Sequence, residues 1–236
     1  MKNKVNVAGH RSGHPGQSLF LSRLFNVVAR VLYGFKYSVR LQSEKGIPTE
    51  GPVLILAKHW ALADVPLGKM AVTRDSGRHL WCVMKESLAR GPFGWFLLRQ
   101  GGIPVNRAQP DKSRHDLLLA RKVLEDNHVL CIFPEQTTTP GRMGRGRAPG
   151  FRFIAGQPKE PIAVVTIGFH YTKRRFRRTL VDIKIGPRHY FTAEDEPEAF
   201  LHERMLEMAR LSGLEYKFEP AEAKSSRASK PVIEQS

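Results

Sequence analysis

Cysteine is scarce in this sequence, with only Cys82 and Cys131 among 236 residues. So few thiols exclude a disulfide framework, and we expect the protein to lie in a reducing compartment. Both cysteines lie in apolar runs typical of strands, so we interpret them as small core residues rather than as reactive thiols.

Long apolar runs are absent as well. No stretch reaches the roughly 20 uninterrupted apolar residues that a membrane-spanning helix needs. The N-terminus also lacks the apolar core of a secretion signal. From the sequence we therefore expect a cytoplasmic protein without a membrane span.

Acidic residues are few, since 22 Asp and Glu stand against 38 Lys and Arg, and the formal net charge is +16. A chain this basic is expected to have an anionic partner, either nucleic acid or an anionic membrane surface. The basic segments 141–150 and 173–178 combine Arg with Gly or Phe, as some RNA-binding segments do. No recognised nucleic-acid module accompanies them. We therefore predict no nucleic-acid partner and a peripheral position on the inner face of the cell membrane.

The chain is long enough for one α/β domain with short ends. Apolar runs typical of strands occur at 53–57, 79–84, 101–106, 129–133, 161–169 and 180–185, and helical patterns occur at 61–73, 111–127, 147–155 and 197–212. Their alternation predicts a single-domain α/β sandwich with a mixed, largely parallel sheet flanked by helices. We assign residues 1–16 to a flexible basic arm, 17–218 to the domain and 219–236 to a disordered tail.

Residues 17–37 have the pattern of an amphipathic helix, with Arg23, Arg30 and Lys36 spaced among bulky apolar residues. Such a helix can bury its apolar face at the lipid headgroup boundary while its cations meet anionic lipid. It can equally be a first helix that packs on the sheet. Both arrangements can hold together.

His59 and Asp64 stand where the apolar run 53–57 gives way to a helical pattern. The turn between them follows the carboxyl end of a strand, where open α/β sheets usually place their ligands. There the carboxylate can accept a hydrogen bond from one imidazole nitrogen and leave the other free to take a proton. The pair is a candidate general base, and a helix-capping His with a solvated Asp is the alternative.

Four segments, in fixed order, resemble the motifs of the glycerolipid acyltransferases typified by lysophosphatidic acid acyltransferase. The first is His-x-x-x-x-Asp, formed here by His59 and Asp64, and the second is a Gly-rich strand ending in Arg, at 101–107. The third corresponds to residues 133–138, Phe-Pro-Glu-Gln-Thr-Thr, and the fourth to the Pro-containing apolar strand 161–166. The resemblance implies that His59 is the base, that Asp64 orients it, and that the second and third motifs bind the acceptor.

The third motif departs from the usual Phe-Pro-Glu-Gly-Thr-Arg, because Gln136 replaces Gly and Thr138 replaces Arg. Losing that Arg removes one phosphate-binding cation, so either the acceptor differs or an Arg of the segment 141–147 substitutes for it. In the first motif, Lys58 stands where Asn is common. The candidates for substrate binding are Gly102, Arg107, Glu135, Gln136, Thr137, Arg142 and Arg145.

The activity that the resemblance implies is transfer of a fatty acyl group from acyl-CoA or acyl carrier protein to a lysophospholipid hydroxyl. The first expectation for the acceptor is 1-acyl-sn-glycerol-3-phosphate, which would give phosphatidic acid, and a lyso-ornithine lipid is the alternative. Direct attack by the acceptor requires neither a metal nor a cofactor beyond the acyl donor, and no metal-ligand spacing is visible. A non-catalytic protein that binds anionic lipid or nucleic acid is the alternative of a different class.

Overall fold

One seven-stranded sheet organises the protein in a computed structural model, which describes residues 14–44, 46–106 and 113–220. Its strands are β1 (Tyr37–Ser43), β2 (Val53–Ala57), β3 (Leu80–Lys85), β4 (Gly102–Val105), β5 (Val129–Ile132), β6 (Ile162–Thr172) and β7 (Thr179–Phe191). Their order is β1-β7-β6-β2-β5-β3-β4. The pair β6 and β7 is antiparallel and the other pairs are parallel. The predicted mixed, largely parallel sheet is confirmed.

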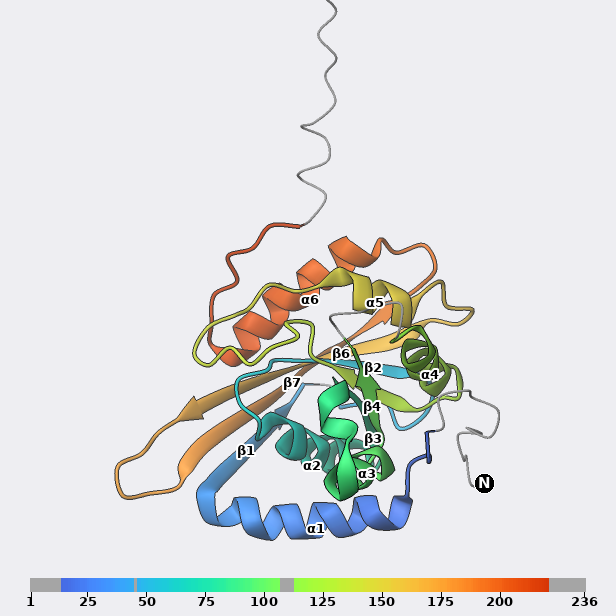
Figure 1. Ribbon diagram of the computed structural model, residues 1–236. Coiled ribbons are helices and arrows are strands. Elements are labelled where there is room, and N and C mark those ends of the chain that lie inside the picture. Colours follow the sequence, from blue (N-terminus) through green and yellow to red (C-terminus); the bar gives the residue numbers. More distant parts are fainter. Residues whose placement is uncertain (1–13, 45, 107–112, 221–236) are drawn as a thin grey trace, which may run out of the picture.

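Helices cover both faces of this sheet (Figure 1). They are α1 (Leu19–Lys36), α2 (Asp64–Ser76), the short 3-10 helix η1 (Glu86–Ala89), α3 (Gly91–Arg99), α4 (Arg114–Glu125), α5 (Ala148–Ala155) and α6 (Pro197–Ser212). Helices α4, α5 and α6 lie on one face, and α1, α2 and α3 lie on the other. The result is the predicted α/β sandwich.

The central strand β2 shows why a continuous apolar run encodes a buried parallel strand. All five of its residues are buried. Leu54 and Leu56 pack in the core beneath α4, α5 and α6, while Val53 and Ile55 pack in the core beneath α2. Because both faces are covered, neither set can be polar.

The sequence pattern did not predict β1 and α3. The helical pattern was expected to reach residue 37, but α1 ends at Lys36 and the chain continues directly into β1 without an intervening Gly or Pro. β1 is an edge strand whose residues are partly or fully exposed, so its polar side chains hide the strand pattern. In α3, two glycines and a proline within nine residues conceal the helix. The predicted start of the next helix at Asp111 lies outside the described residues, as do residues 1–13 and 221–236 of the predicted arm and tail.

Candidate active site

The turn after β2 brings His59 and Asp64 together. β2 ends at Ala57 and α2 begins at Asp64, so both side chains lie beyond the carboxyl end of a central strand. The Nδ1 atom of His59 lies 3.3 Å from Oδ2 of Asp64. The Asp64 side chain is fully buried, whereas that of His59 is 14% exposed. The carboxylate is thus enclosed while the imidazole can be reached from outside.

Two further donors fix the Asp64 carboxylate. The backbone N–H of Ala61 donates to Oδ2 at 2.7 Å, and the Tyr171 hydroxyl donates to Oδ1 at 2.6 Å. The His59 ring packs on the Phe133 ring, with centroids 4.3 Å apart. Because an ionised carboxylate only accepts hydrogen bonds, the proton of a neutral His59 lies on Nδ1 and its Nε2 keeps a free lone pair. This arrangement can take a proton from a hydroxyl group placed at Nε2.

Tyr171 is a site residue that the sequence did not reveal. It lies on β6, 107 positions after Asp64 in the chain. β6 is longer than its neighbour β2 and extends beyond the carboxyl end of β2. Burial, and then the charge of Asp64, raise the pKa of the Tyr171 phenol. The hydroxyl therefore keeps its proton and remains a donor to Asp64.

Removing the Tyr171 hydroxyl should misalign the pair of His59 and Asp64. In Tyr171→Phe, Oδ1 of Asp64 loses a hydrogen bond to a charged group, worth about 1.5–3 kcal/mol. We expect kcat to fall about tenfold to a hundredfold with little change in KM. Initial rates over a range of acceptor concentrations measure kcat and KM separately.

The matched control for this variant is Tyr190→Phe, which removes a hydroxyl from a side chain that is 56% exposed on β7. This variant should keep the wild-type kcat and KM. An unchanged kcat in Tyr171→Phe would mean that the hydroxyl serves packing alone.

Behind the pair, Lys58 and Glu135 form a buried ion pair. The Nζ atom of Lys58 lies 3.0 Å from each Glu135 oxygen, and both side chains are fully buried. Oε1 of Glu135 also accepts the backbone N–H of His59 at 3.0 Å. Oε2 accepts the Thr139 hydroxyl and the backbone N–H of Gly144. Burial lowers the pKa of Lys58, and the charge of Glu135 opposes this effect.

The family resemblance assigns Glu135 to acceptor binding, and this assignment stays a prediction. The Glu135 carboxylate is enclosed, and protein donors occupy both of its oxygens. These hydrogen bonds tie the backbone of His59 to the loop that runs from Thr139 to Gly144. Lys58, noted in the sequence only as a departure from the family motif, supplies the compensating charge.

A cavity of about 430 Å³ adjoins the pair. Its walls are mostly apolar and come from strands β3, β4 and β5 and helices α4 and α5; they include Val83, Val105, Leu117, Ile132, Phe151 and Ile154. Its polar lining residues are Asn106, Ser113, Arg114, Gln136 and Arg147. Phe133 also lines the cavity and contacts the His59 ring, so the cavity and the pair share a wall. Such a site suits an apolar chain that carries an anionic or polar group.

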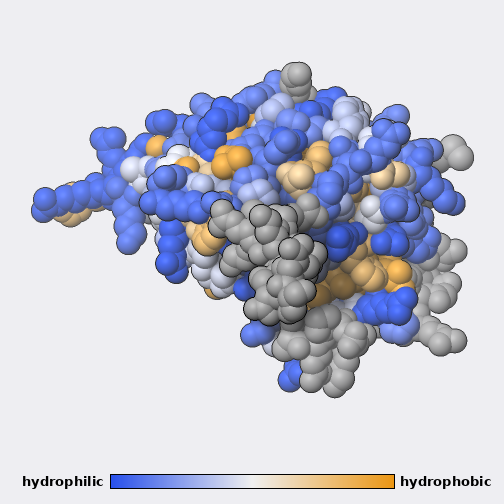
Figure 2. Space-filling view, turned by 90° about the horizontal axis from the view of Figure 1, so that it is seen from above, coloured by the Kyte–Doolittle hydropathy of each residue, from blue (hydrophilic) through white to orange (hydrophobic). Residues whose placement is uncertain are grey.

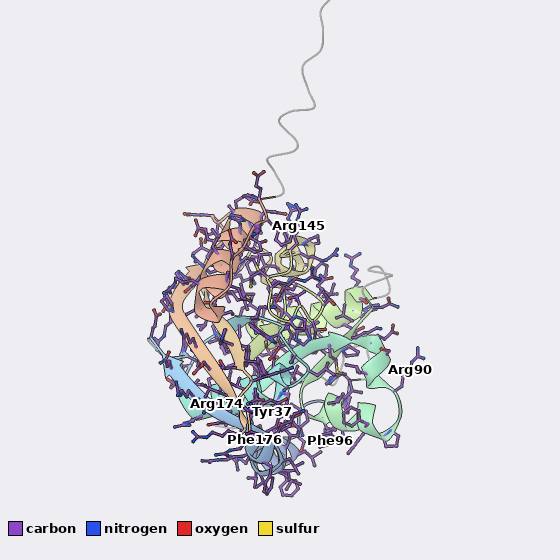
Figure 3. The ribbon with its side chains drawn as sticks, turned by 90° about the vertical axis from the view of Figure 1, so that its left-hand side faces the viewer. Tyr37, Arg90, Phe96, Arg145, Arg174 and Phe176 are labelled. Atoms are coloured by element: carbon purple, nitrogen blue, oxygen red, sulfur yellow. The ribbon has the colours of Figure 1, made fainter. Side chains whose placement is uncertain are left out.

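The other predicted binding residues fall in several places. Gln136 lines the cavity, and its φ of 57° lies in the left-handed region that favours glycine, the residue usual in the family. Thr137, Arg142 and Arg145 are exposed and do not line it. Figure 3 shows Arg145 near α6, on the side opposite α1. Arg147 and Arg114 are the basic residues that reach the cavity among the described residues. Arg147 belongs to the segment 141–147 that the sequence reasoning offered as a source of the missing Arg, whereas Arg114 was not among the candidates.

The second motif contributed two predicted binding residues, Arg107 and Gly102. Arg107 lies outside the described residues. Gly102 is the first residue of β4, so it lies at the amino end of its strand, away from the carboxyl ends beside His59. A Cβ there would meet Sδ of Met84 at 2.8 Å and the carbonyl oxygen of Leu97 at 2.9 Å. Gly102 thus permits close packing at this point, and its role in substrate binding stays a prediction.

The cysteines lie opposite each other in β3 and β5 and form no disulfide. The hydrogen bond with Cys82, followed by burial, raises the pKa of the Cys131 thiol, which makes it a poor nucleophile. In the part of the chain that the structure describes, no group of three His, Cys, Asp or Glu side chains is placed to hold a metal ion.

Comparisons with known proteins agree with this geometry. Residues 38–169, more than half of the chain, match the acyltransferase family. A lyso-ornithine lipid O-acyltransferase from Rhodobacter capsulatus is 28% identical over 131 residues, which cover 54% of this chain and 44% of that protein. The chain thus spans less than half the length of this relative. The crystal structure of the 1-acyl-sn-glycerophosphate acyltransferase PlsC from Thermotoga maritima has the same fold, with a TM-score of 0.58 and 18% identity, covering 83% of this chain and 81% of that one.

Proposed function

This chain belongs to the acyltransferase family, and from that premise we propose that it transfers a fatty acyl group to the hydroxyl of a lyso-lipid. The observation that carries the proposal is the His59 imidazole, oriented by Asp64 and reachable from outside beside an apolar cavity. A neutral imidazole is well suited to remove a hydroxyl proton during attack.

The proposed reaction needs one base and no covalent enzyme intermediate. The acceptor hydroxyl attacks the carbonyl carbon of the acyl thioester while Nε2 of His59 takes its proton. The new ester C–O bond forms and the C–S bond breaks. The leaving sulfur then receives the proton that His59 holds, which restores the neutral base. Asp64 stabilises the imidazolium between these two proton transfers.

For the acceptor, we propose a lyso-lipid with an anionic head group. Arg114 and Arg147 line the cavity and can pair with a phosphate or carboxylate, while the apolar walls accept a chain. The sequence resemblance adds Arg107 as a further head-group ligand. Lysophosphatidic acid is the first acceptor to test.

A lyso-ornithine lipid is the second acceptor, and a specific observation favours it. Gln136 occupies a left-handed backbone conformation at the cavity, which costs energy for any residue with a side chain. Its amide would suit the amide and carboxylate groups of an ornithine head group, and the curated relative acts on a lyso-ornithine lipid according to its name.

We further propose that α1 holds the protein at an anionic membrane surface. No helix within the described ranges has both the length and the apolar character to cross a bilayer. In α1 the face that packs on the protein has Ser22 and Ala29 buried, Asn26 donating to Thr73, and the rings of Phe25 and Tyr33 partly buried. Most of the bulky apolar side chains of α1 are exposed: Leu19, Phe20, Leu24, Val27, Val28, Val31, Leu32 and Phe35. Because α1 packs on the protein and still presents an apolar face, the structure is compatible with both arrangements considered from the sequence.

The test of the function is acyl transfer by the purified protein. Labelled palmitoyl-CoA and palmitoyl acyl carrier protein are each combined with lysophosphatidic acid or a lyso-ornithine lipid in mixed micelles. A parallel preparation that carries His59→Ala reports any product from contaminating enzymes. Phosphatidic acid or ornithine lipid from the wild type alone identifies the acceptor and the donor. A folded protein that binds vesicles but acylates neither acceptor from either donor would leave the non-catalytic lipid-binding alternative.

A further inference from the structure

The connection between β6 and β7 is a basic loop with an aromatic residue at its turn. Residues 173–178, called here the hairpin tip, have the sequence Lys-Arg-Arg-Phe-Arg-Arg, and no residue from 172 to 181 is acidic. Phe176 is 92% exposed and has a φ of 59°. The guanidinium of Arg175 lies 5.1 Å from its ring centroid. Figure 2 shows the hairpin projecting at the left as a largely hydrophilic arm.

The hairpin tip lies on the same side of the molecule as α1. Arg178 donates to the carbonyl oxygen of Gly34 at 2.7 Å, which joins the tip to the end of α1. Figure 3 shows Arg174 and Phe176 on the same side of the molecule as Tyr37, the residue that follows α1, and on the side opposite Arg145. No residue from 18 to 43 is acidic either. One side of the protein thus combines exposed apolar side chains with basic residues and lacks carboxylates in both elements.

We propose that the hairpin tip is a second membrane contact, which places Phe176 at the headgroup boundary of an anionic bilayer while its Lys and Arg side chains bind lipid phosphates. An exposed aromatic ring among cations has this amphipathic character. RNA also attracts Arg with aromatic residues, but the apolar face of α1 on the same side fits lipid and not a nucleic acid.

The last two residues of β6, Tyr171 and Thr172, connect the tip to the candidate active site. Tyr171 donates to Asp64, and the tip begins at Lys173. Trp60, next to His59 in the chain, packs on the rings of His170 and Tyr171. Contacts at α1 and at the tip together would fix how the protein lies on the membrane and hold His59 near the acceptor. This consequence rests on the proposed function, whereas membrane binding by the tip does not.

The experiment is flotation of the full chain with vesicles of phosphatidylcholine that contain 0 or 40% phosphatidylglycerol. Phe176→Ala should lower the partition coefficient for the anionic vesicles about tenfold, because the variant loses the burial of the Phe ring in the bilayer boundary. Phe176→Trp should keep the wild-type value. Arg174→Glu with Arg177→Glu should reduce binding at least about tenfold, since two attractive charges near the anionic surface become repulsive.

Matched controls separate the tip from general effects. The control for Phe176→Ala is Tyr190→Ala, which removes an exposed aromatic side chain on β7 outside the tip. The control for the double Arg variant is Arg145→Glu with Lys159→Glu, which makes the same change in net charge at exposed positions outside the tip. Both controls should float like the wild type. Equal loss in the tip and control variants, or none in Phe176→Ala, would overturn the proposal. So would a tip variant that loses affinity for RNA but not for vesicles. Acyl transfer to a monomeric short-chain acceptor, which should not change in the tip variants, tests the proposed function separately.

Discussion

Replacing His59 by Ala is expected to lower the rate of acyl transfer by about 100- to 10,000-fold, the usual contribution of a general base. The fold should remain, because the side chain is partly exposed and the backbone hydrogen bonds of residue 59 to Glu135 and Thr139 do not need the imidazole. Without a base, the acceptor hydroxyl must lose its proton to water. Initial rates at saturating donor, measured beside thermal unfolding, separate chemistry from stability.

Asp64→Asn is the companion variant for this prediction. The amide can accept from Ala61 or Tyr171, but it carries no charge to stabilise the imidazolium. We expect a severe loss of kcat with the fold retained. If His59→Ala kept more than a tenth of the wild-type rate, the assignment of His59 as the base would be refuted.

The second large effect is expected from Lys58→Met, which breaks the buried ion pair with Glu135. The Met side chain has a similar length but no charge, so the Glu135 carboxylate stays buried without its cation. Removing one partner of a buried pair typically costs about 3–5 kcal/mol of unfolding free energy. Glu135 also accepts the backbone N–H of His59, so activity should fall together with stability. Urea unfolding followed by circular dichroism measures the change.

A double-mutant cycle tests the cause of this loss. Adding Glu135→Gln to Lys58→Met removes the unpaired charge and should recover a large part of the lost stability. Lys159→Met, at an exposed position, is the control and should unfold like the wild type. A Lys58→Met protein as stable as this control would show that the ion pair contributes nothing to the folded state.

The candidate site could be predicted where its residues are close in sequence. His59 and Asp64 are five positions apart, and a strand followed by a turn and a helix is sufficient to bring them together. The turn itself is predictable, because the apolar run of β2 and the start of α2 are local patterns. The polar partners of this pair are distant. Tyr171 and Glu135 reach it from strand β6 and from the loop after β5. The third motif marks Glu135 as a site residue but not as a partner of the His59 backbone, and nothing in the surroundings of Tyr171 marks it at all.

Prediction from the sequence is limited in the same way for Gly102 and for the arginines that were candidates for substrate binding. Gly102 has the sequence context of a binding glycine, yet the side chain of Met84 and the backbone of Leu97 lie against it. Among the arginines of the segment 142–147, only the orientation of the loop places Arg147 at the cavity while Arg142 and Arg145 face solvent. Composition cannot distinguish these three side chains.

The sequence by itself determined the α/β class, most strands and helices of the sheet layers, the His59 and Asp64 pair, and the resemblance to acyltransferases. These features depend on periodicity and on spacing within a few residues, which a linear chain records directly. Only the tertiary structure decided that Lys58 compensates Glu135, that Tyr171 holds Asp64, and that the apolar face of α1 is exposed on the side of the hairpin tip. Each of these depends on which distant segments pack together, and burial then determines whether a charge must be paired or an apolar surface left open.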